Sequence, residues 1–327
     1  MEFRKIGNTD LEASVITFGA WAAGGWMWGS TDRKEAVEAI KASYHEGVTS
    51  IDTAPIYGQG TSEEIVGEAI KGISRDKVQV LTKFGMRWDL DQPHGTLAMH
   101  SKDNQGQPID IYKYAGRESV IKETEASLKR LGTDYIDLMQ IHWPDVTTPI
   151  DETMEALELL IQQGKIRAAG VSNYSTDQVK EARNTLAIVS NQVPYSMLNR
   201  GIEQELVPYS LENELSIIAY SPMERGLLTG KYFNEVNLKE GDHRNAYFKN
   251  FDLHHVKNFI QRIEPLAKEK QISLSQLVLK WTSLQPGITL VLAGARNAQQ
   301  AVENARAIQV KLSDAELQFI RKELDNL

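Results

Sequence analysis

The 327-residue sequence contains no cysteine, so disulfide bonds, thiolate catalysis and zinc–cysteine centres are excluded. Its longest apolar runs fall far short of the roughly 18 residues that suggest a membrane-spanning helix. Its first residues, MEFRKIGNTDLEAS, lack the apolar core of a secretory signal peptide. It also lacks an excess of positive charge, since its formal net charge is −8. This charge argues against nucleic acid or an anionic membrane as the main partner. We therefore expect a cytoplasmic protein.

No low-complexity tract or Pro/Gly/Ser-rich linker divides the chain, so we expect one domain over residues 1–327. Short runs rich in Val, Ile, Leu and Ala alternate with amphipathic segments of three turns or more, which predicts right-handed βαβ units and a parallel sheet. The eight runs span residues 15–19, 49–54, 78–84, 136–142, 166–172, 187–193, 216–222 and 288–294. Eight units favour an α/β protein with a closed (β/α)8 TIM barrel over a doubly wound open sheet.

The amphipathic segments carry helix-end signals. Thr61 and Glu64 have the spacing of a capping box at the start of one helix. Gly47 and Gly72 follow two of the segments and predict C-caps. Helices near 252–270 and 273–284 and an exposed closing helix over 313–324 complete the pattern.

Three segments lie outside the repeating units. The stretch FRKIGNTDLEAS predicts an N-terminal β-hairpin with Gly7-Asn8 at its turn, placed to cap the bottom of the barrel. Residues 85–116 and 223–252 form connections longer than barrel geometry requires. Both follow the C-terminal ends of strands, where such barrels place binding and specificity.

Polar side chains stand where the predicted strands end. Asp52 ends the second run and Tyr57 follows it, while Lys83 ends the third and His142 the fourth. Taken singly, each has a structural explanation: a salt-bridged core acid, an aromatic plug at the rim, or a satisfied buried histidine. Lys83 is harder to explain, because buried lysines are rare unless paired. Four such residues on three neighbouring strands favour a common site.

The chemistry that suits this set is proton delivery to a carbonyl oxygen. A tyrosine with a pKa of about 10 is a poor acid and base near neutrality. An adjacent Lys83 ammonium is expected to lower the pKa of Tyr57, with Asp52 holding the lysine charged and His142 donating to the substrate oxygen. The set contains no good nucleophile, so it needs a hydride source, which indicates a nicotinamide cofactor.

Several motifs resemble the aldo-keto reductase superfamily over essentially the whole chain. DTAPIYGQGTSEEIVGEAI is similar to the first signature of the family, LTKF to its lysine segment, and LKRLGTDYIDLMQIHWP to the signature that ends in its catalytic histidine. The resemblance implies a catalytic tetrad of Asp52, Tyr57, Lys83 and His142, with Tyr57 as the general acid in reduction. It also implies the TIM-barrel fold.

The resemblance further implies a cofactor site. IRAAGVSNYS and NQVPYS resemble segments that bind the nicotinamide carboxamide, and YSPMERGLLTGKY is similar to the bacterial-type branch near inositol-utilisation and general-stress reductases and potassium-channel beta subunits. Tyr220 would stack on the nicotinamide ring, and Arg244 of GDHRN would help to fold its loop over the cofactor. The remaining implied contacts are Gly19, Trp21, Ser172, Asn173, Gln192, Ser221, Met223, Gly226, Leu227 and Lys231.

At the adenosine end the sequence departs from the mammalian reductases. The Lys and Arg that hold the 2′-phosphate there align with Gly294 and Gln300. AGARNAQQAVEN instead offers Arg296, with Glu303 and Asn304 placed as in the bacterial and channel-subunit branch. Arginine suits a bidentate phosphate contact, so NADP(H) is favoured over NAD(H). The glycine-rich Rossmann fingerprint is absent, as this barrel family leads one to expect.

Other features have both a functional and a structural interpretation. Trp21, Trp28, Trp88 and Trp143 are predicted to line an apolar substrate pocket, although aromatic residues also pack barrel rims. Histidines 243, 254 and 255 are expected to be solvated surface groups, and no metal site is expected.

The leading hypothesis is an NADPH-dependent reductase of aldehydes or ketones, including sugar-derived carbonyls, that is reversible toward alcohol oxidation. The alternative is a cofactor-binding regulatory subunit with weak turnover, but channel subunits carry asparagine where this chain has His142. A third interpretation, a metal-dependent barrel hydrolase using Asp52 and His142 as ligands, is disfavoured because no His-x-His pair is present. The sequence carries no signal for the substrate or the oligomeric state.

Overall fold

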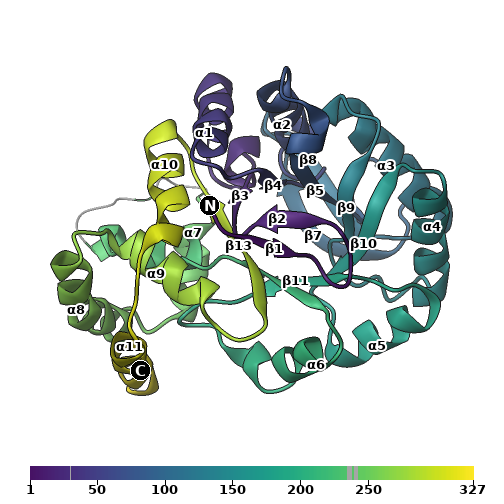
Figure 1. Ribbon diagram of the computed structural model, residues 1–327. Coiled ribbons are helices and arrows are strands. Elements are labelled where there is room, and N and C mark those ends of the chain that lie inside the picture. The colour runs from purple at the N-terminus through teal and green to yellow at the C-terminus, as the bar shows by residue number, and fades with distance from the viewer. Residues whose placement is uncertain (30, 234–237, 239–241) are drawn as a thin grey trace.

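A closed parallel barrel forms the centre of the molecule (Figure 1). The computed structural model describes residues 1–29, 31–233, 238 and 242–327. The predicted (β/α)8 barrel is confirmed, because each of the eight apolar runs overlaps a barrel strand. In barrel order the strands are β3 (Ile16–Gly19), β4 (Ser50–Asp52), β5 (Gln79–Phe84), β9 (Ile136–Ile141), β10 (Ile166–Ser172), β11 (Ser190–Pro194), β12 (Ser216–Tyr220) and β13 (Ile288–Gly294).

Helices surround the barrel (Figure 1). Ser175, Ser273 and Ser313 form full capping boxes with the glutamine or glutamate three residues later, which explains where three helices begin. The helices are α1 (Arg33–His45), α2 (Thr61–Ile70), α3 (Arg117–Leu131), α4 (Ile150–Gln162), α5 (Thr176–Thr185), α6 (Leu206–Glu212), α8 (Leu253–Glu269), α9 (Leu274–Ser283), α10 (Ala298–Arg306) and α11 (Asp314–Asp325). Of these, α8 and α11 pack against each other outside the ring that surrounds the barrel. No helix among the described residues is long and apolar enough to cross a membrane.

The predicted capping box at the start of α2 is wrong. Gly60, with φ 98°, is the N-cap, and Thr61 is already the first helical residue. The Thr61 hydroxyl instead donates to the Gly58 carbonyl at 2.6 Å, and Glu64 accepts from Arg33 at 3.2 Å. The N-cap position is taken by a glycine in the left-handed conformation, which has no side chain. The hydroxyl group that a capping box requires at that position is therefore missing.

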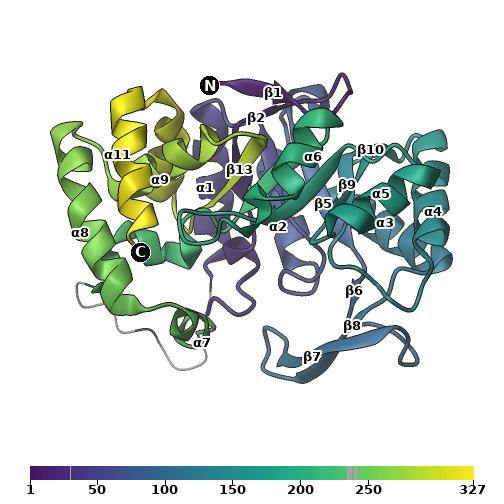
Figure 2. The same cartoon turned by 90° about the horizontal axis from the view of Figure 1, so that it is seen from below.

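The N-terminal hairpin closes the bottom of the barrel, as predicted. Strands β1 (Phe3–Lys5) and β2 (Glu12–Ser14) pair antiparallel. Ile6 and Leu11, at the ends of the turn, pack with Leu81, Leu138 and other side chains from the lower barrel. Figure 2 shows the hairpin at the opposite end of the barrel from β7, β8 and α7. The open end is therefore the C-terminal end of the strands.

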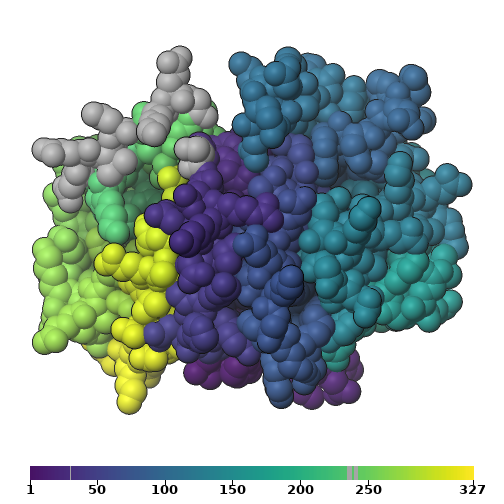
Figure 3. Space-filling model, turned by 90° about the horizontal axis from the view of Figure 1, so that it is seen from above, coloured from purple at the N-terminus to yellow at the C-terminus, as the bar shows by residue number. Residues whose placement is uncertain are grey.

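Residues 85–116, expected to be a long loop, form an antiparallel sheet that we call the arm. Strand β8 (Pro108–Lys113) lies between β6 (Met86–Arg87) and β7 (Thr96–Lys102). Most side chains of β7 are exposed, so the alternating apolar pattern that reveals a strand is weak. Figure 3 shows the arm, in blue, standing out from the barrel body with a notch beside it.

The connection after β12 contains short helical turns rather than regular structure. Its described parts include turns at Glu224–Thr229, Lys231–Phe233 and Phe248–Asn250 and the single turn α7 (Arg244–Tyr247). Ser221, Glu224 and Arg225 have positive φ angles of 54°, 46° and 54°. Such non-glycine strain is typical of functional segments.

Candidate active site

A cavity of about 520 Å3 lies at the C-terminal ends of the barrel strands. It brings together side chains from seven strand ends and from the two long connections. The predicted site residues that line it are Gly19, Trp21, Trp28, Asp52, Tyr57, His142, Trp143, Ser172, Asn173, Gln192, Tyr220, Ser221, Met223, Gly226, Lys231, Arg244, Gly294, Arg296, Gln300, Glu303 and Asn304.

Three predicted residues lie elsewhere. Lys83 is buried beneath Tyr57 and Asp52, below the cavity surface. Leu227 is fully buried in the main hydrophobic core. Trp88, predicted to line the substrate pocket, borders a separate, smaller depression, because the chain turns away from the barrel as β6 pairs with β8.

Asp52 and Lys83 form a buried ion pair below the cavity floor. The Lys83 Nζ donates to Asp52 Oδ1 at 2.6 Å and to the Thr53 carbonyl at 2.9 Å. The second carboxylate oxygen, Oδ2, accepts from Gln192 Nε2 at 2.8 Å. Parallel strands β4 and β5 are neighbours in the barrel, so the two charged residues meet where their strands end. Each charged group of the pair therefore has a further polar partner besides the other, as buried charges require.

Tyr57 and His142 lie above the ion pair. Their ring centroids are 5.6 Å apart, edge to face, and the Lys83 Nζ lies 5.1 Å from the centre of the Tyr57 ring. Burial, with a smaller contribution from the Asp52 carboxylate, raises the pKa of Tyr57 well above its usual value. The expectation of a lowered pKa for Tyr57 is therefore wrong, because burial of the phenol has the largest effect. Lys83 hydrogen-bonds to Asp52 and Thr53 and lies close enough to the Tyr57 ring for its charge to act on a phenolate once one forms.

His142 is uncharged at neutral pH. Burial, followed by the positive charge of Lys83, holds the pKa of His142 well below its usual range. A neutral imidazole has one N–H donor and one acceptor nitrogen. His142 can therefore orient an oxygen by a hydrogen bond without adding charge to the cavity.

The polar residues at the ends of β10, β11 and β12 form a connected network. Tyr220 donates its hydroxyl proton to Asn173 Oδ1 at 2.9 Å, and Asn173 Nδ2 donates to the His142 carbonyl at 3.0 Å. The Ser172 hydroxyl donates to the Gln192 carbonyl at 2.8 Å. Asn173 has a φ of 61°, which an asparagine tolerates better than most residues. These contacts fix one wall of the cavity before any ligand enters.

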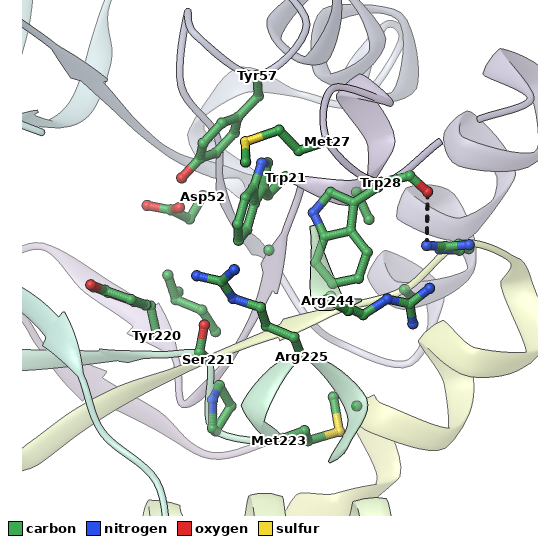
Figure 4. Close-up of a pocket in the computed structure, with 18 of the residues that line it drawn as sticks. Trp21, Met27, Trp28, Asp52, Tyr57, Tyr220, Ser221, Met223, Arg225 and Arg244 are labelled. Carbon is green, nitrogen blue, oxygen red and sulfur yellow. Dashed lines mark hydrogen bonds between the residues drawn. The ribbon is translucent and has the colours of Figure 1, made fainter. Parts of the chain in front are cut away.

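A cluster of unpartnered polar nitrogens faces this network across the cavity (Figure 4). Within the described residues, the buried atoms Trp21 Nε1, Trp28 Nε1, Arg225 Nε and His243 Nε2 have no hydrogen-bond partner. The Trp21 ring lies 5.3 Å from Trp28 and 5.1 Å from His243, centroid to centroid. The Arg225 guanidinium lies 5.1 Å from the Trp21 ring. The Trp21, Trp28 and Arg225 nitrogens are N–H donors, and buried donors without partners are costly, so these three indicate a site for an acceptor-rich, anionic group.

Sequence reasoning missed Arg225. The signal was present in the ERG of the connection after β12, but the direction of a side chain in an irregular turn, here with φ of 54°, is not encoded by a short-range pattern. The structure places its guanidinium 3.7 Å from the Tyr247 ring centroid. Figure 4 shows it reaching toward Trp21. Arg225 is therefore a further residue of the site.

Two arginines meet at the far end of the cavity. Arg244 pairs with Asp242 at 2.6 Å, and Arg296 Nη2 donates to the Trp28 carbonyl at 3.1 Å. Both guanidinium groups lie beside the Trp28 ring, at 5.2 and 5.3 Å from its centroid. Asp242 pairs with Arg244, and Arg296 has no carboxylate partner of its own among the described residues, which leaves net positive charge suited to a phosphate.

The described parts of the chain offer no cluster of metal-ligating side chains. Nowhere among these residues do three or more His, Cys, Asp or Glu side chains gather closely enough to hold an ion. His254 and His255 are exposed at the start of α8, and His255 pairs with Asp252 at 2.9 Å. His243, expected to be solvated, is instead half-buried against Trp21 and Trp28, and its Nδ1 donates to the Met27 carbonyl at 2.5 Å.

A family model described as the aldo/keto reductase family matches residues 15–325. The chain belongs to this family. It is 40% identical over 305 residues to aldo-keto reductase YhdN of Bacillus subtilis, covering 92% of this chain and 86% of that protein. It is 35% identical over 322 residues to the NADH-specific methylglyoxal reductase of Escherichia coli, covering 97% and 96%. A probable voltage-gated potassium channel subunit beta of Arabidopsis thaliana is 28% identical over 321 residues, covering 95% and 92%.

Solved structures of the family are similar throughout. The glycerol dehydrogenase AKR11B4 from Gluconobacter oxydans superposes with a TM-score of 0.86 at 34% identity, covering 99% of this chain and 95% of the other. An aldo/keto reductase from Klebsiella pneumoniae in complex with NADP and acetate has a TM-score of 0.73 at 29% identity, covering 97% and 93%. The predicted resemblance is confirmed, and this aldo-keto reductase is an NAD(P)H-dependent oxidoreductase that acts on carbonyl compounds.

Proposed function

We propose that this reductase reversibly reduces aldehydes or ketones with NADPH, and that Tyr57 supplies the proton. The observation that carries the proposal is the arrangement of Tyr57 and His142 at the cavity floor, above the buried Lys83–Asp52 pair. No other described part of the cavity combines a phenol, a neutral imidazole and a buried ammonium.

The roles of the four residues follow from their protonation. A raised pKa keeps Tyr57 protonated in the resting cavity, so it can donate to the carbonyl oxygen as negative charge develops there. His142 donates a hydrogen bond to the same oxygen and fixes its position. The ammonium of Lys83 stabilises the phenolate that remains, and Asp52 holds Lys83 in place. When bound, the nicotinamide supplies the hydride.

The residues present fit a dinucleotide. The unpartnered nitrogens of Trp21, Trp28 and Arg225 are suited to receive a pyrophosphate, and Tyr220 offers a ring face for the nicotinamide. Ser172 and Asn173 lie beside Tyr220. The side-chain amide nitrogen of Gln192 donates to Asp52, while its side-chain oxygen, Oε1, remains available to a ligand. Trp28 is predicted to contact substrate, but the guanidinium groups of Arg244 and Arg296 beside its ring support a role at the cofactor instead.

The preference for NADPH over NADH rests on the arginine pair at the far end of the cavity. Arg244 and Arg296 both lie beside the Trp28 ring and only Arg244 is paired with Asp242, so a 2′-phosphate there would meet net positive charge. Gln300 accepts from the Arg296 backbone nitrogen at 2.9 Å, which fixes the start of this segment. The NADH-specific methylglyoxal reductase is a relative, so sequence similarity alone does not decide the preference.

Initial rates of cofactor oxidation test the proposal directly. The purified protein should oxidise NADPH in the presence of at least some carbonyls in a panel of aldehydes, ketones and sugars, and it should do so faster than NADH. Tight NADPH retention with very slow turnover across the panel would favour a cofactor-binding subunit instead. Activity lost on treatment with a metal chelator would contradict the mechanism.

A further inference from the structure

One wall of the cavity is apolar and comes from three separate segments. Met27 belongs to the connection after β3, Ile56 precedes Tyr57, and Met86 and Met99 belong to the arm. Met27, Ile56 and Met86 pack in one cluster with Trp26, Ala54 and Ile111, and Tyr57 packs against the same cluster. We call Met27, Ile56, Met86 and Met99 the methionine wall. It adjoins the tyrosine that we propose moves the proton.

The position of this wall is fixed by contacts between the arm and the barrel rim. Trp26 Nε1 donates to Ser101 Oγ at 3.2 Å, and Asn104 Nδ2 donates to the Gly24 carbonyl at 2.9 Å. Both contacts lie close in sequence to Met99, at the tip of the arm. The arm is therefore held against the rim rather than free in solvent.

A glycine next to Tyr57 makes this contact possible. A Cβ atom on Gly58 would lie 2.2 Å from the Gly24 carbonyl oxygen and 2.8 Å from Asn104 Nδ2. The arm tip, the connection after β3 and the loop of Tyr57 therefore touch directly. This packing sets the distance between the wall and the reacting end of the cavity.

Part of the apolar surface is left uncovered at the cavity mouth. Met99 and Trp143 both line the cavity, and each is 37% exposed. When an apolar ligand enters the cavity it covers these side chains, and the removal of their apolar surface from water favours binding. Hydroxyl groups placed against such a wall would lose water without gaining hydrogen-bond partners.

We infer that the natural substrate carries an apolar group of several carbons, alkyl or aryl, next to its carbonyl, and that Met99 contacts this group and selects for it. The inference rests on the proposed carbonyl reduction. Methionine is unbranched and polarisable, so a wall built from it adapts to different apolar shapes and favours aromatic rings. The arm thus acts as a specificity element of this chain, and polyhydroxylated carbonyls such as sugars are disfavoured.

The test compares straight-chain aldehydes from propanal to octanal, benzaldehyde and glyceraldehyde, with NADPH as cofactor. For the wild type, each added methylene that reaches the wall should raise kcat/KM by about fourfold. In Met99→Asp, the ratio of kcat/KM for octanal to that for glyceraldehyde should fall by roughly tenfold or more, since a charge replaces apolar surface.

Leu97→Asp is the matched control. Leu97 lies on the same strand and is 41% exposed, but it does not line the cavity. Its octanal-to-glyceraldehyde ratio should stay at the wild-type value. If Met99→Asp fails to fold, Met99→Gln, which keeps the length of the side chain without charge, should lower the ratio in the same direction.

The outcomes separate this inference from the proposed function. A flat chain-length profile with clear turnover, or equal ratios in the Met99 and Leu97 variants, would overturn the role of the methionine wall and leave carbonyl reduction standing. Absence of turnover with every carbonyl would overturn the proposed function itself.

Discussion

Replacing Lys83 with methionine should cost stability and activity together, and a second substitution should separate the two. The substitution removes the ammonium that lies 2.6 Å from Asp52 Oδ1. The Asp52 carboxylate then stays buried with Gln192 Nε2, 2.8 Å from Oδ2, as its remaining side-chain partner among the described residues. Removing one member of a buried ion pair costs about 3–5 kcal/mol of unfolding free energy.

The double variant Lys83→Met, Asp52→Asn leaves no unpaired charge. It should therefore recover much of the lost stability, because replacing both members of a buried pair is often close to neutral. It should not recover turnover, since the ammonium that stabilises the phenolate is still missing. Lys41→Met, at an exposed pair with Glu38, is the control and should change stability by less than about 0.5 kcal/mol.

Urea denaturation followed by tryptophan fluorescence, with kcat/KM for NADPH-dependent reduction, measures both effects. A loss below about 1 kcal/mol in Lys83→Met would mean that the pair is not buried as described, since exposed pairs contribute that little. Recovery of turnover in the double variant would refute the role of Lys83 in the chemistry.

The remaining predictions concern pH and cofactor choice. Burial lowers the pKa of His243 from 6.5 to about 4. Between these two pH values the imidazole is therefore protonated in the unfolded chain and neutral in the folded chain. Stability should fall as the pH drops from about 6.5 toward about 4, and His243→Asn should flatten that slope in urea midpoints measured at several pH values; an unchanged slope would contradict the burial of His243. Arg296→Ala should reduce the ratio of kcat/KM for NADPH over NADH by roughly tenfold to a hundredfold, because a charge-assisted hydrogen bond is lost. Arg306→Ala, at the last residue of α10 and in an exposed pair with Glu46, should leave the ratio unchanged.

The barrel could be predicted because fully buried parallel strands appear in the sequence as short apolar runs. All eight runs became strands, with ends shifted by a few residues, as for 187–193 and β11 at Ser190–Pro194. The arm could not be predicted, because strand β7 exposes most of its side chains and so lacks a buried face to create alternation.

The site residues at the C-terminal ends of the barrel strands could be predicted from the topology of the barrel. Parallel strands bring their C-terminal ends to one rim, so Asp52 and His142 had to converge. Met99 and Arg225 depend instead on how the arm and the connection after β12 fold back, which no short-range pattern encodes. Trp88 was wrongly assigned to the pocket, because the sequence does not show the direction in which β6 leaves the barrel.

The central claim is that Tyr57 donates the proton to the carbonyl oxygen. The most direct measurement is kcat for Tyr57→Phe with the best aldehyde of the panel, alongside NADPH affinity from tryptophan fluorescence and the control Tyr44→Phe on α1. A positioned general acid contributes roughly 10²–10⁴-fold, so kcat should fall by that factor while NADPH affinity and the control stay near wild type. A Tyr57→Phe variant that kept wild-type kcat would contradict the account.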